Sequence, residues 1–578
     1  MTSPRANSAA ARDIASVLHP YTDLLAHAET GPLVITRGEG VRVWDENGKP
    51  YIEAMAGLWC ASLGFSNERL VEAAAAQMRK LPFYHAFAAK SHEPLITLAE
   101  MLLARAPVAM SKVFFANSGS EANDTAIKMI WYVNNALGRP QKKKIIGRVK
   151  GYHGITLAAA SLTGLAANHR SFDVPLPGFL HTITPHFYHG AQPGESEAAF
   201  AAKSHEPLIK LAEMLLARAP VAMSKVFFAN SGSEANDTAI KMIWYFNNAL
   251  GRPQKKKIIG RVKGYHGITL ASASLTGLPA NHRSFDVPLP GFLHTITPHF
   301  YHGAQPGESE RDFAARCAAE LEALILAEGP ETIAGMFAEP VMGAGGVIVP
   351  PEGYFPAIQA VLRKYDILLV ADEVICGFGR TGNYWGSQTL GVTPDILTCA
   401  KALSASFLPI SAVMVNARVF AALAEESHKI GTFGHGFTYS GHPVPAAVAI
   451  ETLKIYDEIG IIDHVRAVVP AFQRALHGFA DHPLVGETRG LGLLGGIELV
   501  ADKGARQNYD PALKIGPRAA KLLEKHGVIG RAVPGDTLAF TPPLIISESE
   551  IAEMFAAVRG ALDELLAELT REGLAPRL

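Results

Sequence analysis

Residues 367–373 read Ile-Leu-Leu-Val-Ala-Asp-Glu, a short apolar run that ends in two carboxylates. Similar runs lie at residues 225–229 and 333–338, and segments with helical spacing, such as 313–327, lie between such runs. Short runs of this kind are typical of strands buried on both faces, and their alternation with helices predicts a largely parallel sheet between helical layers. We therefore expect an α/β fold whose ligand lies at the carboxyl ends of the strands.

The two ends of the chain have a different pattern. Residues 41–45 and 49–54 flank Glu46-Asn47-Gly48, which is a hairpin signal. Residues 490–500 are rich in glycine and strand-like, whereas residues 548–569 have helical spacing. Both ends therefore predict a smaller α+β domain distinct from the middle. The predicted boundaries are 1–60 for the N-terminal part of the small domain, 61–425 for the large domain and 426–578 for the C-terminal part of the small domain.

The composition excludes several classes of protein. Lys and Arg total 53 and Asp and Glu total 54, so the net charge of −1 provides no field for nucleic acid. No stretch reaches the roughly 18 apolar residues of a membrane span, the N-terminus lacks the apolar core of a secretory signal, and the four cysteines form no metal-binding pattern. We expect a cytoplasmic protein that binds no membrane, nucleic acid or metal. The lysine runs 142–144 and 255–257 are interpreted as solvated edges without function.

One long segment is present twice. Residues 86–197, the first block, recur as residues 199–310, the second block, with an offset of 113 residues. Solenoid repeats are shorter and more divergent, so this duplication does not indicate a solenoid. Because one sheet has room for one copy of each strand, we expect one of the blocks to be supernumerary. The blocks differ at Thr97/Lys210, Val133/Phe246, Ala159/Ser272 and Ala166/Pro279.

Three features carry chemistry. Lys401 lies among apolar neighbours, so it either extends from a strand end to solvent or is an amine kept neutral by desolvation and available as a nucleophile. Asp372 ends an apolar run. Residues 117–123, repeated at 230–236, follow an apolar run and open a helix, where backbone N–H groups suit a phosphate, although an ordinary capped helix has the same pattern.

An apolar strand ending in Asp-Glu is also typical of the magnesium-binding strand of P-loop nucleotidases. The only Gly-Lys pair is Gly48-Lys49, followed by Pro50, so the phosphate-binding motif of that class is missing. Pyridoxal phosphate requires the three features together. The lysine forms the Schiff base, the carboxylate keeps the pyridine nitrogen protonated, and the helix N-terminus holds the phosphate.

On these residues the chain resembles the class III (ω-amino acid or amine:pyruvate) aminotransferases, which have the fold type I architecture with a seven-stranded type of sheet. The resemblance covers essentially the whole chain once one block is removed. It implies pyridoxal 5′-phosphate as cofactor and a homodimer, or a dimer of dimers, in which Thr438 reaches the cofactor phosphate of the partner subunit. The motifs are Ser118–Asp124, Gly151–Gly154, Glu339–Gly346, Asp372–Val374, Gly377–Gly382, Lys401 and Gly436–Pro443.

The resemblance also implies roles for single residues. Lys401 and Asp372 are the expected catalytic residues. Gly119 and Ser120 are expected to bind phosphate, Tyr152 to stack on the ring and Val374 to pack on its other face. The full set of expected cofactor-binding residues is Ser118, Gly119, Ser120, Tyr152, His153, Glu339, Asp372, Val374, Lys401 and Thr438, with Ser231, Gly232, Ser233, Tyr265 and His266 as the second-block alternatives.

We expect the first block to build the site. The extra residues would then leave the fold near Ser196-Glu197, in a polar segment that tolerates insertions. Use of the second block would instead interrupt the aromatic segment 81–85, which we expect to be buried near the pocket, and would cost packing. Ser120 and Tyr152 would serve the cofactor. The second block would be displaced and partly misfolded, and its exposed apolar surface would favour aggregation.

Substrate residues are also implied by the resemblance. Tyr21 and Trp59 would line an aromatic pocket, and Arg531 would pair with a carboxylate or move aside for an apolar group. Relatives that use 2-oxoglutarate commonly have a Glu at the position of Ala344, so its absence favours pyruvate as acceptor. Two alternatives stay open: an aminomutase or decarboxylase with the same residues, and a non-catalytic protein that binds pyridoxal phosphate but whose site the duplication has spoiled.

Overall fold

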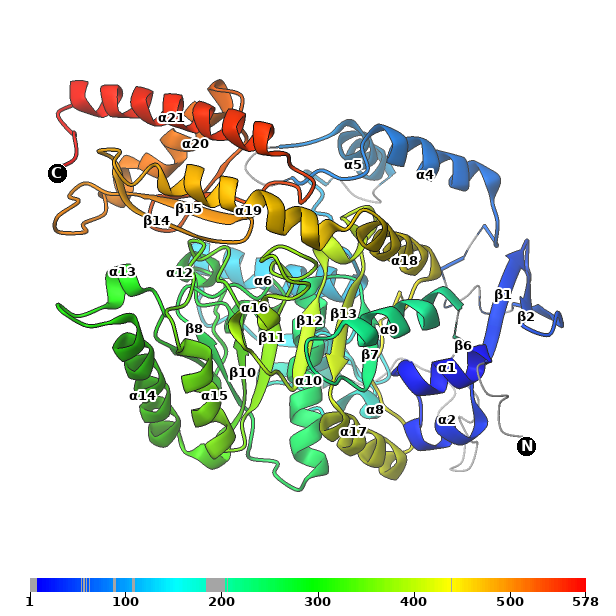
Figure 1. The fold of residues 1–578 in the computed structure, drawn as a ribbon. Helices are drawn as coiled ribbons and strands as arrows, with labels where there is room; N and C mark the ends of the chain where they lie inside the picture. The colour runs from blue at the N-terminus through cyan, green and yellow to red at the C-terminus, as the bar shows by residue number, and fades with distance from the viewer. Residues whose placement is uncertain are drawn as a thin grey trace.

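Two neighbouring strands place the key residues at one edge of the central sheet. Strand β11 (Leu368–Asp372) pairs in parallel with β12 (Ile396–Cys399), and Asp372 lies opposite Thr398. Lys401 follows β12 after a single residue. Strands β11 and β12 lie side by side (Figure 1). Because both run in the same direction, Asp372 and Lys401 lie at the same carboxyl edge of the sheet.

The computed structural model describes residues 8–53, 55, 58, 60–61, 63–86, 90–105, 110–182, 203–204, 206–437 and 439–577. Its largest sheet has seven strands in the order β7-β13-β12-β11-β10-β8-β9. Only β13 is antiparallel to its neighbours, so the predicted mainly parallel sheet is confirmed. The other strands of this sheet are β7 (Lys225–Ala229), β8 (Lys257–Arg261), β9 (Phe292–Thr295), β10 (Ile333–Ala338) and β13 (Ser411–Val415).

Helices cover both faces of this sheet. Successive side chains of a strand point to opposite faces, and Phe227 accordingly packs with α10 and α17 while Val226 packs with α9 and α18. Helices α14 and α15 continue the second layer over β8, β10 and β11. These helices are α9 (Glu206–Arg218), α10 (Gly232–Ala249), α14 (Glu310–Glu328), α15 (Tyr354–Lys364), α17 (Ala417–Ile430) and α18 (Pro443–Glu458). Shorter helices near the sheet are α11 (Leu270–Leu275), α12 (Pro279–His282), α13 (Phe300–Gly303) and α16 (Gly386–Leu390).

The C-terminal residues form a second, antiparallel sheet with its own core. Its order is β14-β15-β17-β16, and apolar side chains of three helices pack against it. The predicted helix over residues 548–569 is confirmed as part of α21. These elements are α19 (Ile461–His477), β14 (Val485–Leu491), β15 (Leu494–Leu499), α20 (Ile515–Lys525), β16 (Arg531–Val533), β17 (Thr537–Phe540) and α21 (Glu548–Arg571).

The N-terminal strands do not join the C-terminal sheet. Strands β2 and β3 form the predicted hairpin, and β1 pairs in parallel with the short strand β6 of the second block. The helix α4 that follows has no buried residue. The elements of this region are α1 (Ala9–Ser16), α2 (Leu24–Thr30), β1 (Leu33–Glu39), β2 (Arg42–Asp45), β3 (Pro50–Ile52), α4 (Glu68–Lys80) and, from the second block, β6 (Lys203–Ser204).

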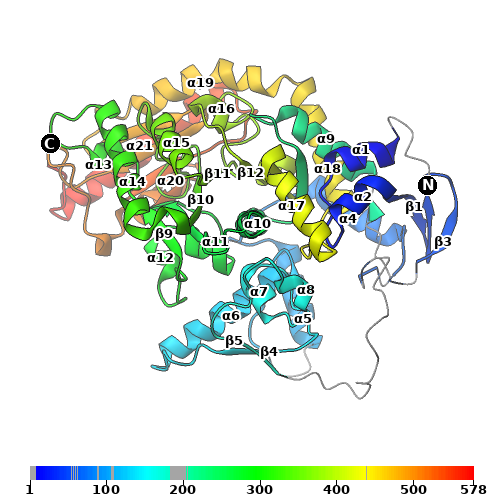
Figure 2. The ribbon, with the colours of Figure 1, turned by 90° about the horizontal axis from the view of Figure 1, so that it is seen from below.

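The second block, not the first, forms part of the central sheet. Strands β7, β8 and β9 and helix α10 all come from it. The first block forms a separate two-stranded sheet, and its helices α6 and α7 lie between this sheet and the second block, in contact with α11 (Figure 2). The prediction that the first block would occupy the sheet, with the second displaced, is therefore wrong. The first-block elements are α5 (Glu93–Arg105), α6 (Gly119–Ala136), β4 (Ile145–Arg148), α7 (Leu157–Leu162), α8 (Ala166–His169) and β5 (Phe179–Thr182).

The wrong prediction rested on a packing cost that the structure does not have. Segment 81–85 was expected to be buried, so that an interruption there would be costly. Instead, Leu81 is 38% exposed and Phe83 is 53% exposed. Leaving the fold after this segment therefore disturbs little packing.

One sequence difference favours the second block. Phe246 is buried in the main core, where the guanidinium carbons of Arg252 and Arg418 lie over its ring. The corresponding Val133 is 52% exposed. A valine at position 246 would leave a cavity, and such cavities cost about 1–3 kcal/mol. The larger residue was therefore a usable signal in the sequence.

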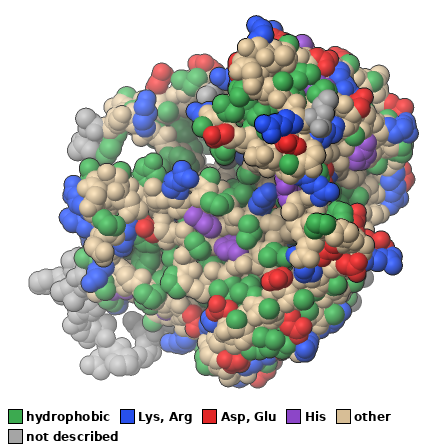
Figure 3. Space-filling view, turned by 90° about the vertical axis from the view of Figure 1, so that its left-hand side faces the viewer, with side chains coloured by type: hydrophobic (Ala, Val, Ile, Leu, Met, Phe, Trp, Pro, Cys, Tyr) green, Lys and Arg blue, Asp and Glu red, His purple; other side chains and the backbone are tan. Residues whose placement is uncertain are grey.

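The surface is mixed in charge. On the face shown in Figure 3, Lys and Arg side chains are interspersed with Asp and Glu, as expected from the net charge of −1. Within the part of the chain that the structure describes, no helix is both long and apolar enough to cross a bilayer.

Candidate active site

Lys401 lies at a strained turn directly after β12. Its φ of +46° is in the left-handed region, which residues other than glycine adopt rarely and mostly at functional sites. Lys401 is solvent-exposed where it lines a cavity, and the protein atoms packed around its side chain partly desolvate the amine. This partial burial lowers the pKa of Lys401, while the nearby carboxylates of Asp372 and Glu339 act in the opposite direction. Burial thus increases the fraction of neutral, nucleophilic amine.

Asp372 is held by the second block. Its Oδ2 accepts hydrogen bonds from Asn236 Nδ2 and His266 Nδ1, both at 2.8 Å, and its Oδ1 accepts one from the backbone N–H of Val374 at 3.1 Å. The carboxylate is only 4% exposed. Thr398 on β12 donates to the amide oxygen of Asn236, which fixes the orientation of that amide. These contacts prevent Asp372 from changing rotamer.

Glu339 and Tyr265 lie next to this group. Glu339 directly follows β10, and its Oε2 accepts the backbone N–H of Tyr265 at 3.2 Å while its Oε1 accepts the N–H of Gly343 at 3.3 Å. Burial raises the pKa of Glu339. Burial also raises the pKa of Tyr265, whose hydroxyl is within electrostatic reach of Arg531 and Asp372. Glu339 thus positions the Tyr265 backbone beside the carboxyl edge of the sheet.

Helix α10 points its N-terminus at this region. Ser231 caps the helix by accepting the N–H of Glu234, and Ser411 of β13 holds the Ser231 carbonyl at 2.7 Å. A Cβ on Gly232 would lie 3.0 Å from Val374, so a larger residue would press the helix away from the loop after β11. Ser233 accepts the N–H of Ile268 at 3.2 Å. The first N–H groups of α10 can therefore receive an anion.

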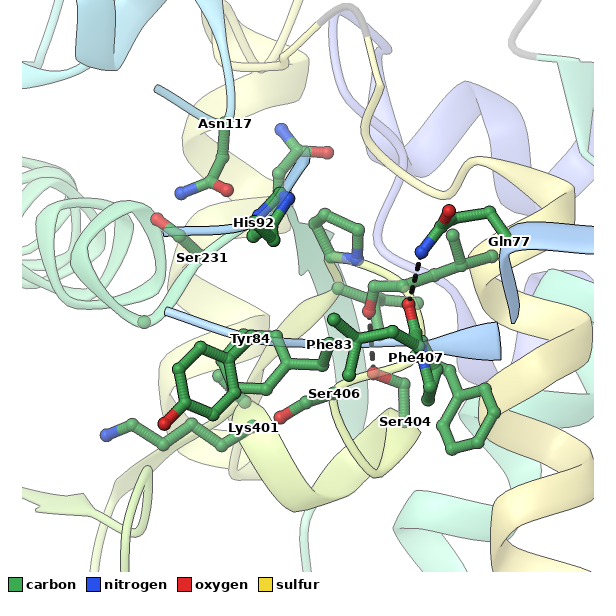
Figure 4. A pocket seen from close by; sticks show the side chains of 18 of the residues that line it. Gln77, Phe83, Tyr84, His92, Asn117, Ser231, Lys401, Ser404, Ser406 and Phe407 are labelled. Atoms are coloured by element: carbon green, nitrogen blue, oxygen red, sulfur yellow. Dashed lines mark hydrogen bonds between the residues drawn. The ribbon is translucent and has the colours of Figure 1, made fainter. Parts of the chain in front are cut away.

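A cavity of about 470 Å³ connects Lys401 with the α10 N-terminus. Figure 4 shows Tyr84 beside the aliphatic part of Lys401, and Asn117 and Ser231 together at another side of the cavity. Phe83 and Phe407 also line it. The segment 81–85 that was predicted to lie near the pocket does so, although it is only partly covered.

The expected first-block residues lie away from Asp372. Ser118 donates to Glu234, Ser120 accepts the N–H of Ile155, and no protein atom of the described residues approaches the Cβ position of Gly119 within 4 Å. Tyr152 donates to the carbonyl of Gly436 at 3.3 Å. His153 hydrogen bonds through its backbone to Asn123 and Thr163. The first-block assignments of Ser118, Gly119, Ser120, Tyr152 and His153 beside Asp372 are thus corrected to Ser231, Gly232, Ser233, Tyr265 and His266.

Of the expected substrate residues that the structure describes, Arg531 lies near Lys401 and Tyr21 contacts the first block. Arg531, at the start of β16, is close enough to Lys401 and Tyr265 to influence the pKa of both. Tyr21 instead contacts Asn168 of the first block, and its hydroxyl interacts with Tyr152. Trp59 and Thr438 lie outside the residues that the structure describes.

The residues fit pyridoxal phosphate. The cofactor has an aldehyde, a basic ring nitrogen and a phosphate, and the structure offers an amine, a buried carboxylate and a helix N-terminus around one region. The second nitrogen of His266, Nε2, is buried without a hydrogen-bond partner among the described residues, so one polar atom next to Asp372 is left unsatisfied. Gly232 leaves the helix end accessible where a side chain would meet Val374.

Sequence comparison identifies the family. A sequence model described as Aminotransferase class-III matches residues 25–200 and 191–562, so it matches the first and the second block separately. The chain therefore belongs to the class III aminotransferases and is a pyridoxal phosphate-dependent enzyme that transfers amino groups. The overlapping matches agree with the two copies seen in the sequence.

Individual relatives agree with this assignment. A protein of Solanum lycopersicum named gamma aminobutyrate transaminase 3, chloroplastic, is 42% identical over 548 residues, which are 95% of this chain and 84% of the relative. A solved structure named "Transaminase with L-ala" is 47% identical, with a TM-score of 0.59, and covers 93% of this chain and 100% of its own. The omega transaminase from Pseudomonas jessenii in complex with PMP is 45% identical, with a TM-score of 0.59, over 98% of this chain and 99% of its own.

Sequence reasoning missed two residues of the site. Asn236 was considered only as part of a phosphate turn, but it holds Asp372. Its position one turn into α10 was the available signal, since that face of the helix points to the same strand ends as the helix N-terminus. Thr398, two residues before the end of an apolar run, carried no signal of its own.

Proposed function

We propose that this enzyme transfers the amino group of an ω-amino acid or a primary amine to pyruvate. The observation that carries the proposal is the position of Arg531, whose guanidinium lies within electrostatic reach of the Lys401 amine and of Tyr265. A guanidinium beside the reacting amine can bind a substrate carboxylate bidentately. The side chain is also exposed at the start of β16, so it can turn to water when an apolar group enters.

We infer the acceptor substrate from the uncharged residue at position 344 and from the names of relatives. Position 344 is half-buried and carries the methyl group of Ala344, so it offers no charge to a second substrate carboxylate. One similar structure is named as a transaminase with L-alanine, the amino acid formed from pyruvate, and the names of several relatives include gamma aminobutyrate, an ω-amino acid. A small keto acid and an ω-amino donor are consistent with these names.

The geometry supports the following roles. Lys401 would hold the cofactor covalently, and its free amine would carry the proton to or from the substrate carbon. Asp372 keeps the ring nitrogen protonated, which supplies the electron sink that the cofactor provides when bound. The N-terminus of α10, with Ser231, Gly232 and Ser233, holds the phosphate. Tyr265 and Val374 pack on the ring, and Glu339 and His266 position these groups.

A donor panel tests the function. With pyruvate as acceptor, we expect alanine to form from 4-aminobutyrate, β-alanine or an arylalkylamine over many turnovers. When the keto acid is left out, we expect at most one equivalent of donor to react per active site, because the bound cofactor accepts one amino group. The measurement is alanine formed and donor consumed per mole of enzyme, with 2-oxoglutarate as the comparison acceptor. Repeated turnover of the donor without any keto acid would contradict a transaminase and would support an aminomutase or decarboxylase.

Replacement of Arg531 tests carboxylate recognition. A charge-assisted hydrogen-bonded pair contributes about 1.5–3 kcal/mol, so Arg531→Ala is expected to raise KM for pyruvate and β-alanine roughly 10- to 100-fold. The KM for an uncharged arylalkylamine should change less than about threefold. Arg311→Ala, at an exposed pair with Glu352, is the matched control. Equal losses for charged and uncharged donors would contradict the assignment.

Two tyrosines at corresponding positions distinguish the blocks. A packed aromatic ring contributes about 0.5–1.5 kcal/mol beyond its buried area, so Tyr265→Ala should weaken cofactor retention roughly tenfold. Tyr152→Ala, at the same place in the first block, should change it less than about twofold. Both are measured as cofactor remaining after dialysis. Loss of cofactor from the Tyr152 variant alone would assign the ring contact to the first block.

Three further expectations stay predictions. They are the cytoplasmic location, the boundaries at residues 60 and 425, and the role of Trp59 and Thr438. The names of several relatives place them in chloroplasts or mitochondria, which applies to those proteins.

A further inference from the structure

The two blocks contact each other in a reciprocal way. When a residue of the first block contacts a residue of the second, the residues 113 positions away make the same contact in the opposite direction. Such reciprocity is the signature of an isologous interface with two-fold symmetry, in which one surface binds a copy of itself. The reciprocal pairs are Ser118–Glu234 and Ser231–Glu121, Leu157–Asp237 and Leu270–Asp124, Lys128–Ile268 and Lys241–Ile155, and Asn135–Asp286 and Asn248–Asp173.

The geometry of the two halves is closely matched. Asp237 accepts the Leu157 N–H at 2.9 Å, and Asp124 accepts the Leu270 N–H at 2.8 Å. The amine of Lys128 lies 4.7 Å from the ring centre of Phe285, and that of Lys241 lies 4.5 Å from that of Phe172. At the edge, Lys143 pairs with Asp286 and Lys256 pairs with Asp173. The two lysine runs interpreted as solvated edges thus each contribute one lysine to this interface.

The surface of the second block that contacts the first block contains buried charged side chains that need hydrogen-bond partners. Asp237 and Lys241 are 1% and 0% exposed, and each has a hydrogen-bond partner in the first block. Buried charges are costly unless they are hydrogen-bonded, so the first block satisfies groups that would otherwise have to be solvated. The first block also reaches the active site, since Asn117 lines the Lys401 cavity and Glu121 accepts the Ser231 hydroxyl.

We propose that the first block covers, within its own chain, the face through which the second blocks of two chains would otherwise pair. The first block, which is a copy of the second block in the same chain, occupies this face. A second chain could offer only the same contacts from its own second block, and the first block already makes them. The homodimer implied by the resemblance is then not formed through this face, because the first block already occupies it.

Crosslinking tests the cover directly. Lys143→Cys and Asp286→Cys are combined in the full chain with Cys60→Ser, which removes the exposed cysteine, and are treated with a flexible bis-maleimide. The remaining cysteines, Cys317, Cys376 and Cys399, are buried. The reciprocal variant, Lys256→Cys with Asp173→Cys, tests the other half of the interface, and the single Lys143→Cys variant is the control. A mixture of isotope-labelled and unlabelled chains shows whether the linked peptides come from one chain.

The expected result is a peptide that links positions 143 and 286 of the same chain. Linked peptides that combine labelled and unlabelled chains would overturn the cover in cis, because they would show an exchange of blocks between two chains. If the introduced cysteines react with the maleimide but no linked peptide forms, the contact between positions 143 and 286 would be overturned.

Discussion

Replacement of Lys401 by alanine is expected to reduce the transamination rate roughly 10⁴-fold. The substitution removes both the nucleophile that holds the cofactor and the amine that moves the proton, and proton transfer alone contributes about 10²–10⁴-fold. The rate is measured as alanine formed from pyruvate at saturating donor. The variant should also lose the visible absorption that the covalently held cofactor gives.

The control for this experiment is Lys364→Ala. Lys364 is exposed on α15 and pairs with Glu322, so its replacement should leave the rate within about twofold of the parent. A Lys401→Ala variant with more than about a tenth of the parent rate would contradict the assignment of Lys401.

Asp372→Asn is expected to lower kcat about 10²–10³-fold. Asparagine has nearly the same shape but no charge, so it cannot hold a proton at the ring nitrogen, and loss of one preorganised electrostatic contact typically costs about 2.7–4 kcal/mol. It also changes the hydrogen bond from His266 Nδ1. The measurement is kcat together with the fraction of cofactor retained, because the account predicts a loss of rate in enzyme that still binds cofactor.

Asp395→Asn is the matched control. Asp395 lies just before β12, accepts the N–H of Leu369 and pairs with Asn416, away from Asp372. Its replacement should affect stability more than kcat. If Asp372→Asn retained the parent kcat with bound cofactor, Asp372 would have no electrostatic role.

The fold could be predicted wherever local pattern and structure agree. The apolar runs at 225–229, 333–338 and 367–371 correspond to strands, and the hairpin signal at Glu46-Asn47-Gly48 was correct. Local pattern fails where identical residues have different surroundings. Lys225–Ala229 forms β7 because β13 is available as its partner, whereas the same pentapeptide at 112–116 forms no strand. Phe227 is 1% exposed and the corresponding Phe114 is 60% exposed.

The same limit applies to the site. Asp372 was recognisable at the end of an apolar run and Lys401 among apolar neighbours, and each occurs outside the duplicated blocks and therefore only once. The choice between Tyr152 and Tyr265 could not be made from motifs, since both copies carry the same motif. It depended on burial of residues outside the motif, such as Phe246, and on the low packing cost of interrupting segment 81–85. Contacts across the chain, such as Asn236 with Asp372, follow only from the three-dimensional arrangement.

The most direct test of the central assignment is borohydride reduction of the enzyme with bound pyridoxal phosphate, followed by peptide mapping. Reduction makes the link between lysine and cofactor permanent, so the modified peptide identifies the lysine. The account predicts the pyridoxyl group on Lys401, in the peptide that follows β12. A pyridoxyl group on Lys364, Lys429 or a lysine of either block, with Lys401 unmodified, would contradict it.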